Sequence, residues 1–183
     1  MRAFVAIDLP PDAVTALTHL QERLRVGRKV DPDNFHVTLA FLGEDVADEA
    51  LEALHDQLLA LRLPGFPLEL RGVSTQSAAK PVLIAADVVR TDALETLHAR
   101  IASAARRAGI TLEKRRFRPH VTLARLKRGA DGTDLEKLRR ALEGEARFRL
   151  DPFEVRSFAL YQSTLTHDDP IYEELARYLL SGL

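Results

Sequence analysis

The chain has 183 residues, 46% of them hydrophobic, and a formal net charge of −1. It contains no cysteine, which excludes disulfides, thiolate metal ligands and thiol nucleophiles, so we expect a protein of a reducing compartment, the cytoplasm. No apolar stretch approaches the roughly 20 uncharged residues that span a bilayer, and the first apolar run is too short for a signal peptide.

The first part of the chain is predicted to alternate strands and helices. An apolar run predicts a strand at 3–9, and Pro11 then opens a segment whose leucines are spaced for one helical face. Residues 35–42 alternate in polarity and are rich in β-branched and aromatic side chains, which is typical of a strand. A second amphipathic helix is expected over 51–61, followed by a strand at 67–73.

The same order of elements is then repeated. We predict a strand, a helix, a strand and a helix at 82–89, 91–109, 119–126 and 133–144. Gly109 suits the left-handed conformation that ends a helix, and Thr133 with Glu136 forms a capping-box pattern. The remaining residues predict strands at 147–150 and 153–161 and a short helix from Pro170, with Leu175 and Leu179 facing inward.

We therefore expect one α+β domain over residues 1–183 with two pseudo-symmetric lobes. The lobes would span roughly 1–75 and 80–150, and a closing strand and helix at 151–183 would complete the domain. Antiparallel sheets around a central cleft fit this repeat, because the connections are short and each lobe must have its apolar face covered by other elements. The order of elements alone is also compatible with a parallel, doubly wound sheet.

Charge is distributed unevenly along the chain. Residues 1–60 hold 5 basic and 11 acidic side chains, whereas residues 111–150 hold 12 Lys or Arg and 6 Asp or Glu. Four of these basic residues precede a histidine closely, namely Lys114, Arg115, Arg116 and Arg118. This segment is interpreted either as an electropositive wall for a phosphate-bearing ligand or as a solvated charged surface.

The tetrapeptide His-Val-Thr-Leu occurs twice, at 36–39 and at 120–123. Each copy falls in a predicted strand that lies between two predicted helices. A single His-x-Thr on a strand is most often structural, so the equivalent position of the two copies is a stronger signal than their identity. The repeat therefore predicts a site built from both halves of the chain.

The two copies carry the side chains that phosphodiester chemistry needs. Alternate residues of a strand share a face, so His36 and Thr38 point one way, and His120 and Thr122 do the same. With an approximate twofold axis both pairs would face one cleft. One imidazole would take a proton from the attacking oxygen and the other would give one to the leaving oxygen, since an ordinary histidine pKa is about 6.5. The threonine hydroxyls would donate to the non-bridging oxygens.

Other chemistries find little support in the sequence. There is no His-Glu-x-x-His motif, no histidine cluster and no Gly-x-Ser-x-Gly elbow, and the glycines do not follow the spacing of a phosphate-binding loop. We therefore expect no metal and no cofactor.

Both tetrapeptides resemble the paired His-x-Thr motifs of the 2H phosphoesterase superfamily. Within it the chain is most similar to the RNA 2',3'-cyclic phosphodiesterases, also called 2'-5' RNA ligases. Further segments resemble the same group, namely those at 1–10, 41–44, 117–125, 163–166 and 170–172. The resemblance thus covers nearly the whole chain.

The resemblance implies a LigT-like fold of two α+β lobes with the motifs lining a central cleft. It implies a reaction that opens a terminal 2',3'-cyclic phosphate to a 2'-phosphate without metal or nucleotide. It further implies that His36 is the proton donor to the departing 3' oxygen and that His120 is the proton acceptor, which activates water. The partners would be RNA ends or nucleoside 2',3'-cyclic phosphates, with no membrane and no obligate protein partner.

Three further residues are candidate substrate contacts: Arg118, Arg125 and Phe41. By strand parity Phe41 lies on the face of Val37, which favours the core. Arg125 is five positions beyond His120 and faces away from it unless the strand bends.

The remaining histidines are expected to lie outside the site. His19, His55 and His98 are interpreted as surface residues of helices, and His167 as part of a solvated turn.

Two other functions are compatible with the same motifs. The first is a non-catalytic module that binds RNA ends or nucleotides through the cleft and the basic segment. The second is ligation by the reverse reaction, in which a 5'-hydroxyl takes the place of water.

Overall fold

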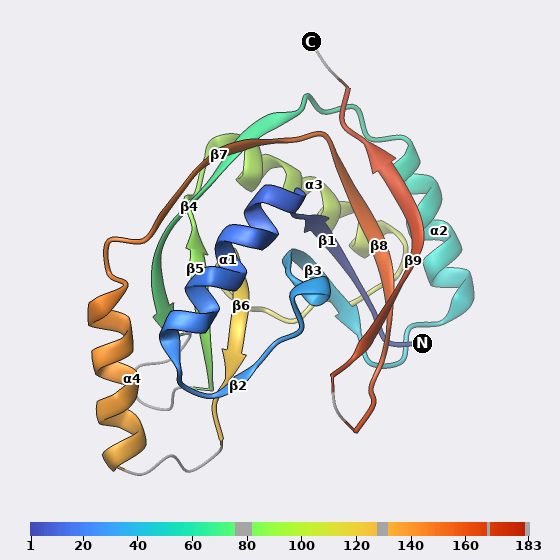
Figure 1. The fold of residues 1–183 in the computed structure, drawn as a ribbon. Coiled ribbons are helices and arrows are strands. Elements are labelled where there is room, and N and C mark those ends of the chain that lie inside the picture. Colours follow the sequence, from blue (N-terminus) through green and yellow to red (C-terminus); the bar gives the residue numbers. More distant parts are fainter. Residues whose placement is uncertain (76–81, 128–131, 168, 182–183) are drawn as a thin grey trace.

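The computed structural model describes residues 1–75, 82–127, 132–167 and 169–181. Within these ranges the strands form two sheets, in which all neighbouring strands are antiparallel (Figure 1). The first sheet contains, in spatial order, β3 (His36–Gly43), β1 (Ala3–Asp8), β8 (Ser157–Thr164) and β9 (Ile171–Leu179). The second sheet contains β2 (Arg28–Lys29), β6 (His120–Arg125), β5 (Leu83–Val88), β4 (Phe66–Thr75) and β7 (Arg149–Val155).

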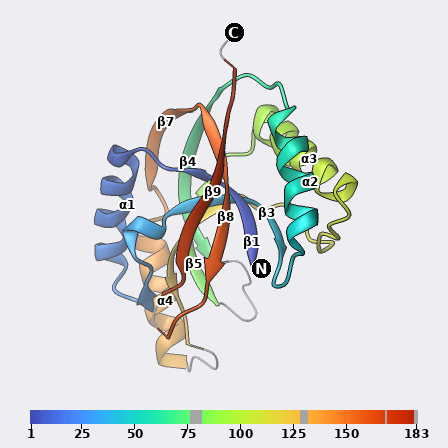
Figure 2. The ribbon, with the colours of Figure 1, turned by 90° about the vertical axis from the view of Figure 1, so that its right-hand side faces the viewer.

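Helices cover the sheets from two sides. In the described ranges these are α1 (Pro11–Leu24), α2 (Asp48–Leu59), α3 (Asp92–Arg107) and α4 (Gly132–Gly144), with a short 3-10 turn at Pro32–Asn34. Figure 2 shows α1 and α4 on one side of the sheets and α2 and α3 on the other. α1, α2 and α3 turn apolar residues at helical spacing toward the sheets, whereas α4 buries Leu138 and packs beside α1. In α3, for example, Leu94, Leu97 and Ile101 are at most 1% exposed, and burying each contributes about 1.5–3 kcal/mol.

The predicted α+β class with antiparallel sheets is confirmed, and the parallel alternative is wrong. The repeated order also appears: β1, α1, β3 and α2 are matched by β5, α3, β6 and α4. The expected boundary between the repeats, at 76–79, lies outside the described residues. No helix in the described ranges is long and apolar enough to cross a membrane.

The chain passes from one sheet to the other, so each half contributes strands to both sheets. β4 follows α2 but pairs with β5 and β7 in the second sheet. Later the chain passes back at Arg156, between β7 in the second sheet and β8 in the first. The single strand predicted at 153–161 is therefore two strands, one in each sheet.

The predicted closing helix is wrong, because these residues form β9. Leu175 and Leu179, which were expected to face inward, are 40% and 79% exposed, while Tyr178 is 3% exposed. Glu, Leu, Ala and Arg favour helices locally, but this segment pairs with β8 over its whole length. Tertiary pairing thus overrides a weak intrinsic preference.

Candidate active site

The two motif strands lie next to each other near the centre of the molecule (Figure 1). β3 pairs with β1 in the first sheet, and β6 pairs with β5 in the second. In both pairs an aspartate stands opposite the motif histidine, Asp8 opposite His36 and Asp87 opposite His120. The two sheets therefore give the histidines equivalent backbone surroundings.

The two imidazoles are held by the same kind of hydrogen bond. Nδ1 of His36 lies 2.8 Å from the carbonyl oxygen of Asn34, and Nδ1 of His120 lies 2.7 Å from that of Arg118. A carbonyl oxygen only accepts, so Nδ1 carries the hydrogen in both rings. Nε2 is therefore the nitrogen that can exchange a proton with a ligand, and Nε2 of His36 also lies 3.0 Å from the hydroxyl of Thr38.

Both motif strands contain a β-bulge at the same point. Thr38 and Ala40 have consecutive partners on β1, so Leu39 is an extra residue in β3. The same skip occurs at Leu123 in β6. One extra residue reverses the alternation of side chains beyond it.

The bulges bring two more side chains to the motif face. Phe41 is half-buried and lines a cavity with Thr38, so the prediction that parity places it in the core is wrong. Arg125 occupies the equivalent position in β6 and lines the same cavity, as expected only if the strand bends.

A central cavity of about 190 Å³ lies between the motif strands. His36, Thr38 and Thr122 line it together with Phe41 and Arg125. Its remaining lining residues are Arg2, Phe4, Val30, Asn34, Ser163 and Tyr172. The cavity thus offers one imidazole, hydroxyls from both motifs and two arginines, which is a donor-rich setting for an anion.

A second cavity, here called the basic cavity, adjoins the central one and has a volume of about 490 Å³. His120 and Arg118 line it, and Arg2, Thr38 and Phe41 line both cavities. The two motif histidines therefore lie in adjoining cavities rather than on opposite sides of the molecule.

The pKa of His36 is lowered from its ordinary value. Burial is the largest cause, because a low-dielectric surrounding disfavours the charged ring. The positive charges of His120 and Arg125 add to this effect, while the bond to the Asn34 carbonyl and the charge of Asp8 oppose it. The influence of His120 indicates that the two imidazoles are electrostatically coupled.

Sequence reasoning missed the aromatic and acidic surroundings of His36. Its ring packs against Phe4 at 5.0 Å and edge-on against Tyr172 at 5.3 Å, measured between ring centroids. Asp8 accepts a hydrogen bond from Tyr161 and pairs with Arg177. Tyr172 belongs to the segment that was expected to be helical, and only the family resemblance at 170–172 included it. Asp8 lies in the resembling segment at 1–10, and its place opposite His36 follows from the β1–β3 register once that pairing is known.

Each bulge is anchored by a helix from the opposite half of the chain. Gln21 of α1 is 4% exposed, and its amide donates to the carbonyls of Val30 and Leu123 at 2.7 and 2.8 Å. Nδ1 of His98, on α3, donates to the carbonyl of Leu39 at 2.8 Å. The two extra residues thus have their carbonyl oxygens satisfied by side chains across the pseudo-symmetric interface.

His98 and His55 are not the surface residues that were expected. The His98 ring stacks on Phe117 with 3.9 Å between ring centroids and 2° between the planes. Nδ1 of His55 lies 2.9 Å from the hydroxyl of Tyr178. Both imidazoles are half-buried, whereas His19 is exposed as predicted. Among the described residues no group of three or more His, Cys, Asp or Glu is placed to hold a metal ion.

Comparison with known families adds to this geometry. Residues 9–165 match the model of the 2'-5' RNA ligase superfamily. The chain belongs to the 2'-5' RNA ligase superfamily. Its two motif strands, β3 and β6, both fall inside the matched region.

Curated relatives within the superfamily cover most of this chain. An RNA 2',3'-cyclic phosphodiesterase of Aeropyrum pernix is 33% identical over 150 residues, covering 81% of this chain and 83% of that protein. A protein of the same name from Archaeoglobus fulgidus is 30% identical over 179 residues, covering 96% and 98%. The crystal structure of Escherichia coli LigT complexed with 3'-AMP has a TM-score of 0.77 and 28% identity, with 98% of each chain covered.

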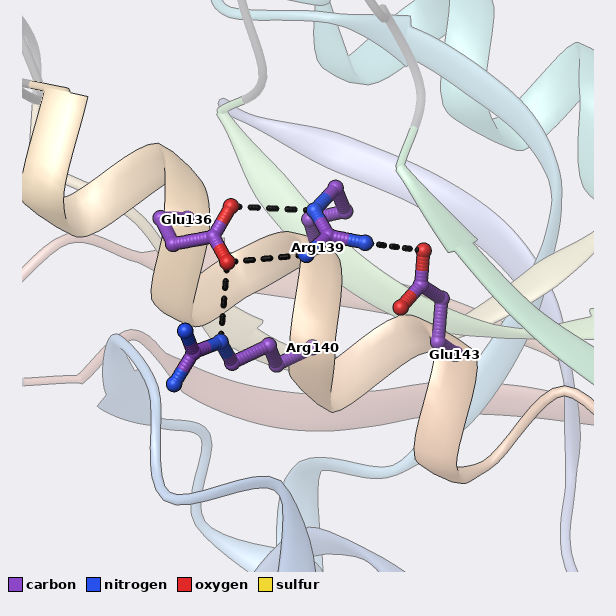
Figure 3. Close-up of polar contacts among 4 residues, drawn as sticks. All are labelled: Glu136, Arg139, Arg140 and Glu143. Atoms are coloured by element: carbon purple, nitrogen blue, oxygen red, sulfur yellow. Dashed lines mark hydrogen bonds and ion pairs between the residues drawn. The ribbon is translucent and has the colours of Figure 1, made fainter.

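In the described part of the basic segment, the residues before His120 and those of α4 have different surroundings. Arg115, Arg116 and Arg118 line the basic cavity. The arginines of α4 instead pair within their own helix: Glu136 accepts from Arg139 and Arg140, and Glu143 accepts from Arg139 (Figure 3). These pairs lower the pKa of Glu136 to about 2. The segment before His120 therefore fits the interpretation as an electropositive wall. Helix α4 fits the other interpretation, a solvated charged surface.

Proposed function

We propose that this chain is an RNA 2',3'-cyclic phosphodiesterase that opens a terminal 2',3'-cyclic phosphate to a 2'-phosphate without a metal or nucleotide cofactor. One observation carries the proposal: two imidazoles with the same Nδ1 hydrogen bond line adjoining cavities that share Thr38. Relatives covering most of the chain bear the name of this activity. A cytoplasmic location and the lack of an obligate protein partner stay predictions.

The proposed reaction uses one proton transfer on each side of the phosphorus. Nε2 of His120 accepts a proton from water as its oxygen attacks the phosphorus. Nε2 of protonated His36 donates to the departing 3' oxygen, so the 2' oxygen keeps the phosphate. Because burial lowers the pKa of His36 in the free protein, its donor role depends on the bound phosphodiester anion, whose negative charge favours the protonated ring.

The remaining lining groups would stabilise charge on the phosphoryl group. The hydroxyls of Thr38 and Thr122 donate to the non-bridging oxygens, where negative charge grows in the transition state. Arg125 adds a fixed positive charge in the same cavity. Arg118 and Phe41 would contact the substrate from the basic cavity. The non-catalytic binding module is not favoured, since the named relatives bear the name of an enzyme and this chain covers 83% and 98% of their length.

Product analysis with an oligonucleotide ending in a 2',3'-cyclic phosphate tests the proposal. We expect a 2'-phosphate as the product, and we expect His36→Ala and His120→Ala each to lower turnover by roughly 10²- to 10⁴-fold. His19→Ala is the matched control, because that histidine is exposed on α1. Retained turnover in either motif variant would remove that histidine from the reaction, and salt-dependent RNA binding without any turnover would favour the binding module.

A further inference from the structure

The carboxylate of Asp8 lies beside His36 on the motif face of the first sheet. The two residues are direct partners on β1 and β3, and such partners turn their side chains to the same face with Cβ atoms about 4.5–5.5 Å apart. Both line a third cavity, here called the acidic cavity, which has a volume of about 500 Å³ and adjoins the central one. The ring nitrogens of His36 already lie against the Asn34 carbonyl and the Thr38 hydroxyl. Asp8 can therefore act on this ring through its charge rather than through a hydrogen bond.

Two neighbouring strands hold the Asp8 carboxylate in place. The hydroxyl of Tyr161, on β8, donates a hydrogen bond to Oδ1, and the guanidinium of Arg177, on β9, lies 2.6 Å from Oδ2. The Tyr161 ring stacks on Phe4, with 5.3 Å between ring centroids and 19° between the planes. Burial and the bond to Asp8 raise the pKa of Tyr161, so its hydroxyl keeps its proton and remains a donor. The orientation of the carboxylate is thus fixed.

The pairing with Arg177 does not cancel the negative charge at this place. Arg177 also pairs with Glu174, so the three side chains together carry one net negative charge. The charge of Asp8 accordingly raises the pKa of His36, against the larger effect of burial.

The positive groups around His36 act in the opposite direction. Arg125 and His120 disfavour its protonation, and Arg2 lines the central cavity with it. Burial raises the pKa of Tyr172, so the ring that packs edge-on against His36 stays neutral. A protonated His36 therefore needs a nearby negative charge.

The other carboxylates of the acidic cavity are less suited to supply that charge. Asp31 and Asp33 are exposed, so solvent screens them, and Asp169 pairs with Arg28 at 3.1 Å. Asp8, in contrast, is half-buried and held next to the ring.

The equivalent aspartate of the second sheet has different surroundings. Asp87 stands opposite His120, but its carboxylate accepts a hydrogen bond from Ser74 at 2.6 Å. It lines a separate cavity of about 340 Å³, whose described lining residues include neither motif histidine. This difference matches the proposed roles, because a proton donor must be charged before the reaction and a proton acceptor must be neutral.

We propose that Asp8 is a positioning residue that keeps His36 in the protonated form needed to donate to the 3' oxygen. The inference rests on the proposed function, in which His36 is the donor. The substrate adds its own negative charge only once it is bound. Asp8 acts already in the free protein, the form whose protonation kcat/KM describes.

The pH profile of Asp8→Asn tests this role. The amide keeps the size of the carboxylate and can still accept from Tyr161, but it has no charge. At a pH low enough to protonate His36 fully, kcat/KM of the variant and of the wild-type protein should coincide. At neutral pH the variant should be about three- to tenfold slower, and its acidic limb should lie at lower pH. Asp8→Glu, which keeps the charge, should restore most of the loss.

A matched control and a second readout separate this role from a structural one. Asp87→Asn removes the equivalent aspartate and should leave the acidic limb where it is. NMR titration of the His36 ring needs no turnover, and the ring should lose its proton at lower pH in Asp8→Asn than in the wild-type protein. A loss by the same factor at every pH, or an unchanged titration of His36, would overturn the role of Asp8. Absence of hydrolysis by the wild-type protein would instead overturn the proposed function, whatever the titration shows.

Discussion

At the scale of single residues, His36 and His120 have the same hydrogen bond at Nδ1 but different neighbours. His36 packs against the rings of Phe4 and Tyr172 in the central cavity, while His120 lines the wider basic cavity beside Arg118. Two groups with the same tautomer but different surroundings are suited to opposite proton transfers.

The pH dependence of catalysis follows from the lowered pKa of His36. A lowered pKa means that His36 loses its proton at a lower pH than an ordinary imidazole. The profile of kcat/KM should be bell-shaped, because the active form needs a protonated His36 and a neutral His120. The lower apparent pKa of the pair sets the acidic limb, which should therefore lie below pH 6.5, the ordinary pKa of histidine. Steady-state kinetics between pH 4 and pH 9 check this, and both limbs describe the coupled pair. A profile without limbs would contradict proton transfer by two imidazoles.

The direction of proton transfer can be measured with a better leaving group. A 4-nitrophenolate leaves without protonation, so a 3'-deoxynucleoside 2'-(4-nitrophenyl phosphate) does not need the proton donor. His36→Ala should lose less than about tenfold on this ester while losing 10²- to 10⁴-fold on the cyclic phosphate. His120→Ala should be slow on both substrates. The opposite pattern would show that His120 is the proton donor and His36 the proton acceptor.

At the scale of elements, the matched bulges in β3 and β6 decide which side chains reach the site. Strand periodicity correctly placed the histidines and threonines on one face, because they precede the extra residue. It failed for Phe41, because no feature of the tetrapeptide indicates that Leu39 is skipped in the ladder. The helical spacing read from residue 170 onward also gave a wrong prediction, because local helix preference gives way there to pairing with β8.

Gln21 and His98 are expected to stabilise the motif strands by bonding to the bulge carbonyls. Gln21→Leu should lower the free energy of unfolding by about 1–3 kcal/mol, because the Val30 carbonyl loses its side-chain donor and the Leu123 carbonyl keeps only the N–H of Val30. It should also lower kcat through misplacement of Arg125. Urea denaturation and kinetics measure both effects, with Gln57→Leu as the control, since Gln57 bonds at the surface to Arg107.

His98→Phe separates the two contacts of that residue. The substituted ring keeps its stack on Phe117 but loses the bond to the Leu39 carbonyl. We expect a smaller loss of stability than for Gln21→Leu, because one side-chain hydrogen bond is lost rather than two. Equal stability of His98→Phe and the wild-type protein would show that the bulge in β3 needs no side-chain donor.

At the scale of the whole molecule, the repeat in the sequence indicated two similar halves but not how they are joined. The halves exchange strands, because β4 lies beside β5 and β8 lies beside β1. Sequence periodicity describes single elements and contains no information on which sheet a strand enters. The helices add to this connection, since α1 bonds to β6 and α3 bonds to β3.

The exchange predicts that the chain unfolds as one unit. Calorimetry should show a single transition whose calorimetric and van't Hoff enthalpies agree. If the gene is divided after residue 78, neither fragment should fold alone, whereas the coexpressed fragments should associate and regain activity. Two separate transitions, or a folded single fragment, would contradict one cooperative domain.

The exchanged strands also relate this single chain to symmetric assemblies. Topologically it corresponds to a swapped dimer whose two subunits have been fused into one polypeptide. A designed protein made from one half would therefore have to be a homodimer, in which each copy contributes a strand to the sheet of the other. In such a dimer one His-x-Thr motif per subunit would rebuild the pair, but both imidazoles would have identical surroundings, and the asymmetry between donor and acceptor would be lost.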